Sequence, residues 1–373
     1  MTAVVLATGD LAMDRADCDE SFVATRDVLS AADIVFGQLE TSFAANGTRL
    51  PQARHAVLAR PEGAAALGRA GFDVISCAGN HVLDWGNEAF TETQHHLRAA
   101  GMQVVGAGPD IAAARTPARF TLPDGTTVAF LAYSSILPQA YWADERRHGC
   151  APMRAFTVYE QIEHDQPGTP PRIHTFPHRG DLAAMTADIR AAKAANDIVF
   201  VSHHWGIHFV RASIADYQRD VARAAVEAGA DVILGGHAHI LKGCELIDGK
   251  PVFYSLCNFA TDLRMDPAHA ASASFNEIRA LAEVWEPDFD SLYNFPDAAR
   301  ASMVARFEIA AGKVVRAGFL PLDIGTDAIP RFVARGSARH AEIVDYMTAI
   351  TAEAGLNARY RSCDDMVELE LAA

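Results

Sequence analysis

Along the chain, short β-branched and aliphatic runs alternate with longer amphipathic, alanine-rich stretches. Apolar runs of roughly four to eight residues between turn residues are typical of buried strands, and a helical apolar period is typical of helices on a sheet. The expected strands are 3–8, 33–38, 73–78, 103–108, 127–134, 197–202 and 231–236. The expected helices lie near 21–31, 61–70, 87–100, 181–195 and 215–228. This alternation predicts an α/β fold.

Two later segments have a different pattern. In 243–256 and 303–322, a turn signal separates two apolar runs, as in β-hairpins. Hairpins add antiparallel strands to parallel ones, so we expect a mixed sheet or two packed sheets. The chain has no internal repeat, and we expect residues 1–373 to form a single domain with a C-terminal extension from about 325.

Two long segments interrupt the alternation. Residues 135–180 are rich in Pro, His, Arg and aromatic residues. A loop of that length in a compact domain is usually functional or disordered, and we expect a lid insertion here. Residues 262–300, which include Trp285 and Phe295, are expected to cover another side of a cleft.

Composition narrows the class of protein. Hydrophobic residues make up 50% of the chain and charged residues 21%, which is typical of a globular protein. The formal net charge of −15 argues against a general nucleic-acid or anionic-membrane surface. The N-terminus lacks a signal-peptide pattern, no apolar run approaches the roughly 20 residues that cross a bilayer, and the six cysteines form no C-x-x-C pair. We therefore expect a cytoplasmic protein with reduced thiols and no nucleic-acid or membrane partner.

Metal-ligand residue types follow five of the expected strands. They are Asp10, Glu40, Asn80 with His81, His203 with His204, and His237 with His239. Because ligands bind outside the carboxyl ends of the strands in open α/β sheets, these side chains are expected to converge on one point. His237 and His239 would point to opposite faces of a continuing strand, so a common target requires the backbone to turn after the glycines, and we expect Gly235 and Gly236 to permit that turn.

The order of five short motifs is more specific. They are GD (9–10), QLE (38–40), GNH (79–81), SHHWG (202–206) and GGHAH (235–239). This order resembles the motif series of calcineurin-like metallophosphoesterases, and the segments GFDVISCAGNHVLDWG and AGADVILGGHAH resemble the CapA family of poly-γ-glutamate capsule proteins within that superfamily. The resemblance covers most of residues 4–260. It implies a metallophosphoesterase-type sandwich of two mixed β-sheets flanked by helices.

The resemblance also implies a centre of two divalent metal ions. One ion would be held by Asp10, Glu40 and His239, and the other by Glu40, Asn80, His204 and His237. Carboxylates and imidazoles suit Mn, Fe or Zn, and among these we favour Mn. Ala12 stands where the superfamily has histidine, so the first ion would be held more openly.

Further residues are expected to act on the substrate. His81 is the candidate for proton transfer, because a histidine beside a metal site can protonate a leaving group. Asp84 is expected either to orient His81 or to cap the next helix. Candidate substrate-binding residues are His203, His208, Arg154 and Arg179. For the histidines the alternative is a structural position, and for the arginines it is a solvated surface position.

These features predict a metal-dependent hydrolase that activates water against an amide, γ-glutamyl or phosphoester bond. One alternative is a lyase or epimerase that uses the same site to move a proton on a small oxygenated substrate. Another is a non-catalytic binding protein in capsule assembly. The expected substrate is a small or short peptide-like molecule, anionic in character, and the sequence leaves the oligomeric state open.

Overall fold

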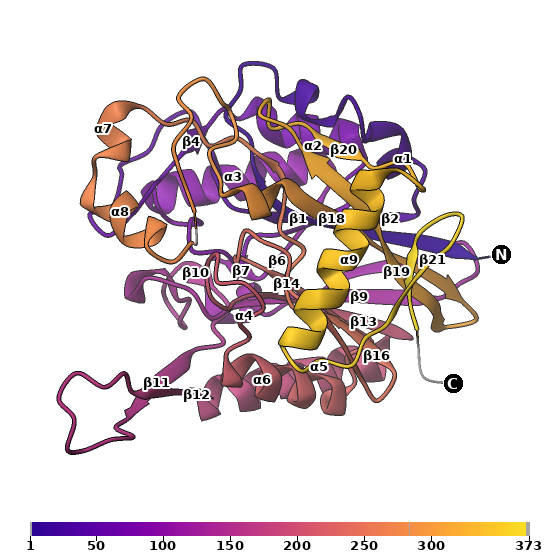
Figure 1. Cartoon of the computed structure of the whole chain (residues 1–373). Helices are drawn as coiled ribbons and strands as arrows, with labels where there is room; N and C mark the ends of the chain where they lie inside the picture. Colours follow the sequence, from indigo (N-terminus) through magenta and orange to yellow (C-terminus); the bar gives the residue numbers. More distant parts are fainter. Residues whose placement is uncertain (1, 283, 371–373) are drawn as a thin grey trace.

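The fold is built around two mixed β-sheets (Figure 1). The structure is a computed structural model that describes residues 2–282 and 284–370. In spatial order, the larger sheet contains β21 (Tyr360–Ser362), β22 (Val367–Leu369), β19 (Lys313–Ile324), β18 (Ala301–Ala310), β1 (Ala3–Ala12), β2 (Ile34–Leu39), β5 (Val74–Ser76) and β6 (Gln103–Val105). Two more strands join it: β17 (Asn258–Thr261) beside β1, and β20 (Pro330–Phe332) beside β19.

The smaller sheet contains the second group of expected strands. Its order is β15 (Cys244–Ile247), β16 (Lys250–Phe253), β14 (Val232–Gly236), β13 (Ile198–His204), β9 (Thr127–Ser134) and β8 (Ala118–Thr121). The strands β9, β13, β14 and β16 are parallel, whereas β15 and β8 are antiparallel edges. The larger sheet is also mixed, because β1, β2, β5 and β6 are parallel and β18 and β19 are antiparallel. The expected mixed α/β architecture is confirmed.

Short pairs and helices complete the described part of the chain. The small two-stranded pairs are β3 (Ser42–Phe43) with β4 (Leu58–Ala59), β7 (Ala107–Gly108) with β10 (Gly149–Cys150), and β11 (Ala155–Glu160) with β12 (Arg172–Pro177). The helices are η1 (Cys18–Phe22), α1 (Arg26–Ser30), α2 (Glu62–Ala70), α3 (Gly86–Ala99), α4 (Ile111–Ala114), η2 (Gln139–Tyr141), α5 (Arg179–Ala195), α6 (Asp216–Ala228), α7 (Pro267–Ala270), α8 (Ala273–Arg279), η3 (Asp297–Arg300) and α9 (Ala338–Glu353). None of the helices in this described part is long and apolar enough to cross a bilayer.

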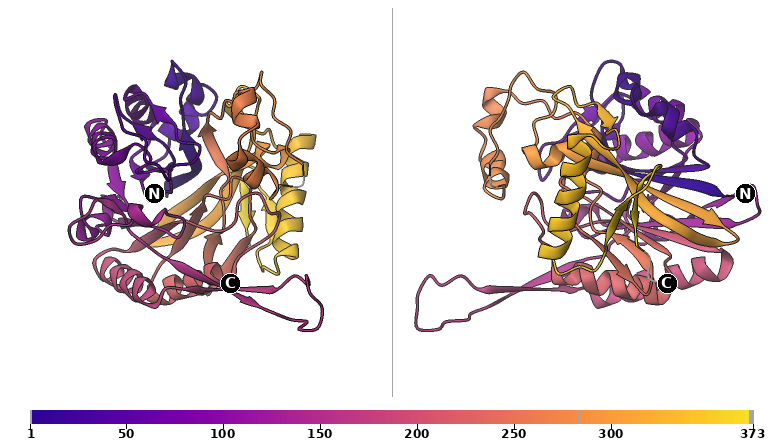
Figure 2. Two further views of the ribbon diagram at one scale, coloured as in Figure 1. Left: turned by 90° about the vertical axis from the view of Figure 1, so that its left-hand side faces the viewer. Right: turned by 45° about the vertical axis from the view of Figure 1, so that its right-hand side comes forward.

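A layer of apolar side chains joins the two sheets. Phe36 of β2 stacks on Phe130 of β9, with ring centroids 5.9 Å apart. Phe130 in turn stacks on Phe200 of β13 at 4.8 Å, and Phe200 meets the edge of Phe307 of β18 at 5.2 Å. Helices α2 and α3 pack against the outer face of the larger sheet, and α5 and α6 against the smaller one (Figure 2). Because both faces of the central strands are covered, these strands are apolar throughout.

Residues 135–180 form two different structures. Tyr141, Cys150 and Met153 are buried against the body of the protein. The strands β11 and β12 instead make a hairpin that projects from the body (Figure 2). After about residue 325, β20, β21 and β22 extend the larger sheet, so the expected C-terminal extension continues the sheet.

Candidate metal centre

Two buried carboxylates come from neighbouring strands of the larger sheet. Asp10 lies in β1 at a point where the strand register shifts against both β17 and β2. Glu40 directly follows β2, and its backbone N–H donates to the carbonyl oxygen of Leu11. Both side chains are buried, so each loses the hydration it would have at the surface and needs a compensating partner.

Three histidines approach these carboxylates from the smaller sheet. His204 is the last residue of β13, and His237 and His239 follow β14. The backbone turns at the histidines themselves, with φ of 87° at His237 and 54° at His239. Gly235 and Gly236 remain inside β14 and are not left-handed. The backbone thus turns after the glycines, as expected, and the left-handed residues of the turn are the histidines and not the glycines.

The two glycines instead allow close approach. A Cβ atom at Gly235 would lie 2.2 Å from the carbonyl oxygen of Tyr254, and one at Gly236 would lie 2.8 Å from Oδ1 of Asp10. The backbone N–H of His237 also donates to Oδ2 of Asp10 at 3.0 Å. The absence of side chains at the last two residues of β14 thus lets the end of the smaller sheet touch a carboxylate of the larger one.

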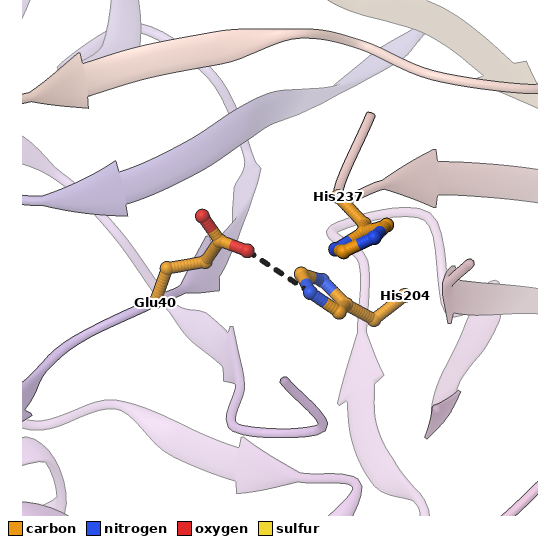
Figure 3. Close-up of side chains that lie close together, drawn as sticks. All are labelled: Glu40, His204 and His237. Carbon is orange, nitrogen blue, oxygen red and sulfur yellow. Dashed lines mark ion pairs between the residues drawn. The ribbon is translucent and has the colours of Figure 1, made fainter. Parts of the chain in front are cut away.

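The ligand-type side chains form two groups that share Glu40. In each group, one ligand atom per residue lies within 4.8 Å of the others: Glu40 with His204 and His237, and Asp10 with Glu40 and His239. Figure 3 shows the first group, in which Oε1 of Glu40 lies 2.9 Å from Nε2 of His204. In the second, the two ring nitrogens of His239 each lie 3.5 Å from a carboxylate oxygen. A carboxylate shared by two ligand groups is the arrangement that dinuclear sites use.

The chemistry of these groups fits divalent metal ions. Among the described residues, Oδ1 of Asp10, Nδ1 of His204 and Nδ1 of His237 are buried without a hydrogen-bond partner. Buried polar atoms are rarely left unpaired, because each costs about 1–3 kcal/mol. Asn80 adds an amide oxygen 2.6 Å from Nε2 of His204. Carboxylate, amide and imidazole donors together suit Mn, Fe or Zn.

The electrostatics of Glu40 and His237 favour the forms that bind a metal, whereas those of Asp10 disfavour its ionised form unless a cation is bound. Burial raises the pKa of Asp10, and the neighbouring charge of Glu40 raises it further. Burial also opposes ionisation of Glu40, but the facing His239 and His204 hold its pKa at about 2. Burial lowers the pKa of His237 well below its ordinary value, which keeps the ring neutral. A neutral imidazole and an ionised bridging carboxylate are the forms that bind a cation.

His81 is held in place by a short hydrogen-bonded chain. Its Nδ1 lies 2.6 Å from Oδ2 of Asp84, and the hydroxyl of Tyr141 donates to the other Asp84 oxygen at 2.8 Å. Helix α3 begins after Trp85 and has no side-chain cap, so Asp84 contacts His81 and not the helix N-terminus. Because Nδ1 contacts Asp84, Nε2 is the ring nitrogen of His81 that the proton transfer expected from the sequence would use.

A cavity of about 410 Å³ opens beside these residues. Glu40, Asn80, His81 and His239 are among its lining residues, and so is Ala12 at the position where a histidine was expected from the superfamily pattern. The covering segments are 54–57 and 261–295. Among the described residues, none of 135–180 lines the cavity, whereas residues of the second expected covering segment, 262–300, do.

Of the four candidate substrate-binding residues, only His208 is among the described residues that line the cavity. His208 lines the cavity, and its ring centroid lies 3.9 Å from that of His237. His203 is fully buried on the other face of β13, with its ring between those of Tyr133 and Trp205. Adjacent residues of a strand point to opposite faces, so His203 cannot join His204 at the site. The structural alternative for His203 is the one observed.

The two arginines also lie elsewhere. Arg154 forms a bidentate ion pair with Asp181 and lies over the ring of Trp142. Arg179 is exposed at the start of α5. Neither is among the described residues that line the cavity, so the structure does not place Arg154 or Arg179 at the substrate.

Comparison with known proteins identifies the family. Residues 4–263 match the family described as bacterial capsule synthesis protein PGA_cap. The chain belongs to this family. The PGA biosynthesis protein CapA of Bacillus subtilis (strain 168) is 27% identical over 246 residues, which cover 65% of this chain and 57% of that protein. The probable polyglutamine synthesis accessory protein Rv0574c of Mycobacterium tuberculosis (strain ATCC 25618 / H37Rv) is 30% identical over 258 residues, which cover 68% of this chain and 61% of that protein.

These matches have limits set by length and similarity. The aligned part of this chain spans 57% of the length of the Bacillus subtilis protein and 61% of the length of the Mycobacterium tuberculosis protein, less than two thirds in each case. A solved structure of the calcineurin-like phosphoesterase YfkN from Bacillus subtilis is 13% identical, with a TM-score of 0.39 over 95% of this chain and 97% of that one. A similarity at that level adds nothing to the strand order and site geometry described above.

One site residue of this PGA_cap protein was missed in the sequence. Oδ1 of Asn258 lies 2.7 Å from Nδ1 of His239, and its Nδ2 donates to the hydroxyl of Tyr293. Asn258 begins β17, which runs parallel to β1 beside Asp10. It stands in the segment SLCNF, directly after Cys257, whose φ is 65°. The available signal was a polar residue at the start of an apolar strand.

Proposed function

We propose that this PGA_cap protein is a metal-dependent hydrolase with a dinuclear centre. The observation that carries the proposal is the pair of ligand groups sharing Glu40 at the joined ends of the two sheets. When bound, two divalent ions supply an activated water and polarise the bond to be cleaved. The fold alone would not support this assignment, because function depends on the site and not on the architecture.

The residues of the chain have distinct roles in this proposal. Glu40 would contribute ligands to both metal positions, and Asn80 would complement the group formed by Glu40, His204 and His237. Asp84 keeps the ring of His81 in one orientation, so that Nε2 can give a proton to the leaving group. The ring of His208 covers the site on the side of His237.

The bond class is proposed from the family. Two relatives carry names that refer to PGA biosynthesis and polyglutamine synthesis, so we propose an amide or γ-glutamyl bond, with a phosphoester as the chemical alternative. A lyase or epimerase remains the second candidate, because His81, Asp84 and Tyr141 form a chain that can move a proton without hydrolysis. Product analysis in H₂¹⁸O separates the two, since only hydrolysis incorporates the label.

The first test is metal content. Elemental analysis of freshly purified protein is expected to give about two transition-metal ions per chain, and the variant His237→Ala is expected to lose at least one. His95→Ala is the matched control, because His95 is an exposed histidine on α3. If the wild type binds no ion after incubation with Mn, Fe or Zn, the proposal fails.

A further inference from the structure

The cavity beside the proposed metal ligands is lined by polar residues on the side of the ligands and by apolar residues elsewhere. One wall carries Glu40, Asn80 and His81. The other is apolar over most of its extent and is formed by Phe209, Met265, Ile278, Leu281, Trp285 and Phe295. A cavity that is largely apolar with a few convergent polar groups is typical of a site for a small molecule.

The apolar wall begins next to His239, one of the proposed metal ligands. The ring of Phe295 lies 5.1 Å from that of His239, and the ring of Phe209 lies 5.8 Å from it. Phe209 contacts Trp285 at 4.8 Å, and Trp285 contacts Phe275 at 5.0 Å. The indole N–H of Trp285 is satisfied by the carbonyl oxygen of Asn294, so the ring offers only its hydrocarbon surface to the cavity. A substrate group next to the reacting bond would therefore contact aromatic carbon.

The cavity offers little to a chain of carboxylates. Among the described residues that line it, Arg54 is the one arginine or lysine, and it is paired with Glu277, also a lining residue, at 3.1 Å. The lining carboxylate of Asp262 is bound by Arg15. Away from the proposed metal positions, each charge of a polyanion would lose hydration here without gaining an unpaired arginine or lysine among the described lining residues. The surroundings thus disfavour several negative charges in one occupant.

We propose that this wall, named the apolar subsite and formed by the six residues above, binds an aliphatic or aromatic substituent next to the scissile bond. The substrate class is then an amide or ester with an apolar group, and a poly-γ-glutamate chain is a poor occupant of the subsite. This inference rests on the proposed function, because the metal centre determines where the scissile bond lies. It accounts for Ala12, whose methyl group adds apolar surface at a position that is histidine in the superfamily pattern.

An adjoining cavity, lined by several arginines, is the place where an anionic substrate would bind if the inference were wrong. It also has a volume of about 410 Å³, shares Arg54 and His55 with the first cavity, and adds Arg49 and Arg264. Nδ1 of His55 lies 2.7 Å from Nε2 of His269 at this boundary. If the substrate were anionic along its length, its charges would be held here, and a charged tail would bind better than an apolar one.

A pair of phosphonates of the same shape tests this contrast. 4-Methylpentylphosphonate and 4-phosphonobutanoate share a metal-binding head and differ in an isopropyl or a carboxylate tail. Calorimetry on the Mn²⁺-loaded full chain should show the apolar compound binding at least about tenfold tighter, because each buried methylene contributes about 0.8 kcal/mol. Equal binding, or tighter binding of the carboxylate, would overturn the inference.

Two variants in the same segment localise the effect. Leu281 lines the cavity and is 46% exposed, whereas Val284 is 73% exposed and is not among the lining residues. Both tolerate a polar side chain without loss of core packing. Leu281→Asn is expected to reduce the preference for the apolar phosphonate by about threefold or more. Val284→Asn should leave it unchanged, and an equal loss in both variants would count against the apolar subsite.

A neutral probe separates this inference from the proposed function. N-Phenyl-1-naphthylamine needs no metal, and its fluorescence rises in apolar sites. Binding that weakens in Leu281→Asn but not in Val284→Asn supports the apolar subsite even if neither phosphonate binds, in which case only the metal chemistry fails. If phosphonates bind with Mn²⁺ but the tail makes no difference, the metal centre stands and the subsite is refuted.

Discussion

The close approach of Gly236 to Asp10 can be tested with one methyl group. In Gly236→Ala, the added Cβ would lie 2.8 Å from Oδ1 of Asp10, whereas its other neighbours are at 3.5 and 3.7 Å. The backbone of Gly236 is extended, so alanine introduces no conformational strain. The carboxylate must therefore move by a few tenths of an ångström. Because Asp10 belongs to only one of the two ligand groups, the change should affect one metal ion more than the other.

The expected magnitude follows from the size of this shift. Changes that misorient a ligand without removing it typically reduce metal affinity by about 10- to 100-fold, or about 1.4–2.8 kcal/mol. Titration of metal-free protein with Mn²⁺ by calorimetry should show one weakened site and one site near wild-type affinity. Urea unfolding of the metal-free protein should change little, because the methyl group meets one carboxylate oxygen and not the backbone.

Two glycines provide matched controls. A Cβ at Gly79 would lie no closer than 3.3 Å to any neighbour, so Gly79→Ala should retain both sites. A Cβ at Gly235 would lie 2.2 Å from a backbone oxygen, so Gly235→Ala should destabilise the fold itself. The reasoning is refuted if Gly236→Ala binds both ions as the wild type does, or if Gly79→Ala loses one equally.

Three further predictions concern stability and pH. Tyr141→Phe removes a hydrogen bond to the buried Asp84 carboxylate and should lower the free energy of unfolding by about 1.5–3 kcal/mol in urea melts. Turnover should also fall, because His81 is held less firmly. Unchanged values in both assays would contradict the hydrogen-bonded series Tyr141–Asp84–His81. Phe130→Ala opens a cavity between the sheets and should cost about 3–5 kcal/mol, and a loss below about 1 kcal/mol would show that the site collapses. Burial and a neighbouring histidine lower the pKa of His55 to about 4, so the folded state binds fewer protons than the unfolded one between about pH 4 and 6.5. Stability should therefore fall with decreasing pH in this window, and His55→Asn, which accepts the positive φ there, should reduce the dependence; an equal slope in both proteins would refute it.

Much of the secondary structure could be predicted from the sequence, because it depends on residues that are close together in the chain. Apolar runs and helix-ending glycines, such as Gly71 with φ of 99° and Gly229 with φ of 113°, depend on neighbours a few residues away. The same pattern places Glu40 directly after its strand, whereas β1 runs past the expected end at residue 8 and contains Asp10. The order of the elements and the residue types at their ends could thus be predicted from periodicity and motif spacing.

Other features depended on contacts between distant segments. Periodicity places His203 and His204 on opposite faces of one strand, but only the packing of β13 between helices and the second sheet decides which face holds the site. The partner of Asp84 was open in the sequence, because a hydrogen bond and a helix cap require the same carboxylate. Of the two arginines expected at the substrate, Arg154 is held by Asp181, which the spacing did not reveal, and Arg179 is exposed at the start of α5.

The sequence by itself determined the strands and helices, the polar residues at the strand ends and the family, since each rests on local pattern or motif order. The tertiary structure decided which of those residues meet, what covers them and why the glycines are there. Asp10 and His237 are 227 positions apart, and their contact exists because the two sheets pack face to face and Gly236 lets the end of β14 approach Asp10. The covering wall came from 261–295, since apolar residues there bury their surface against His239 and Phe209, whereas β11 and β12 pair with each other and project away.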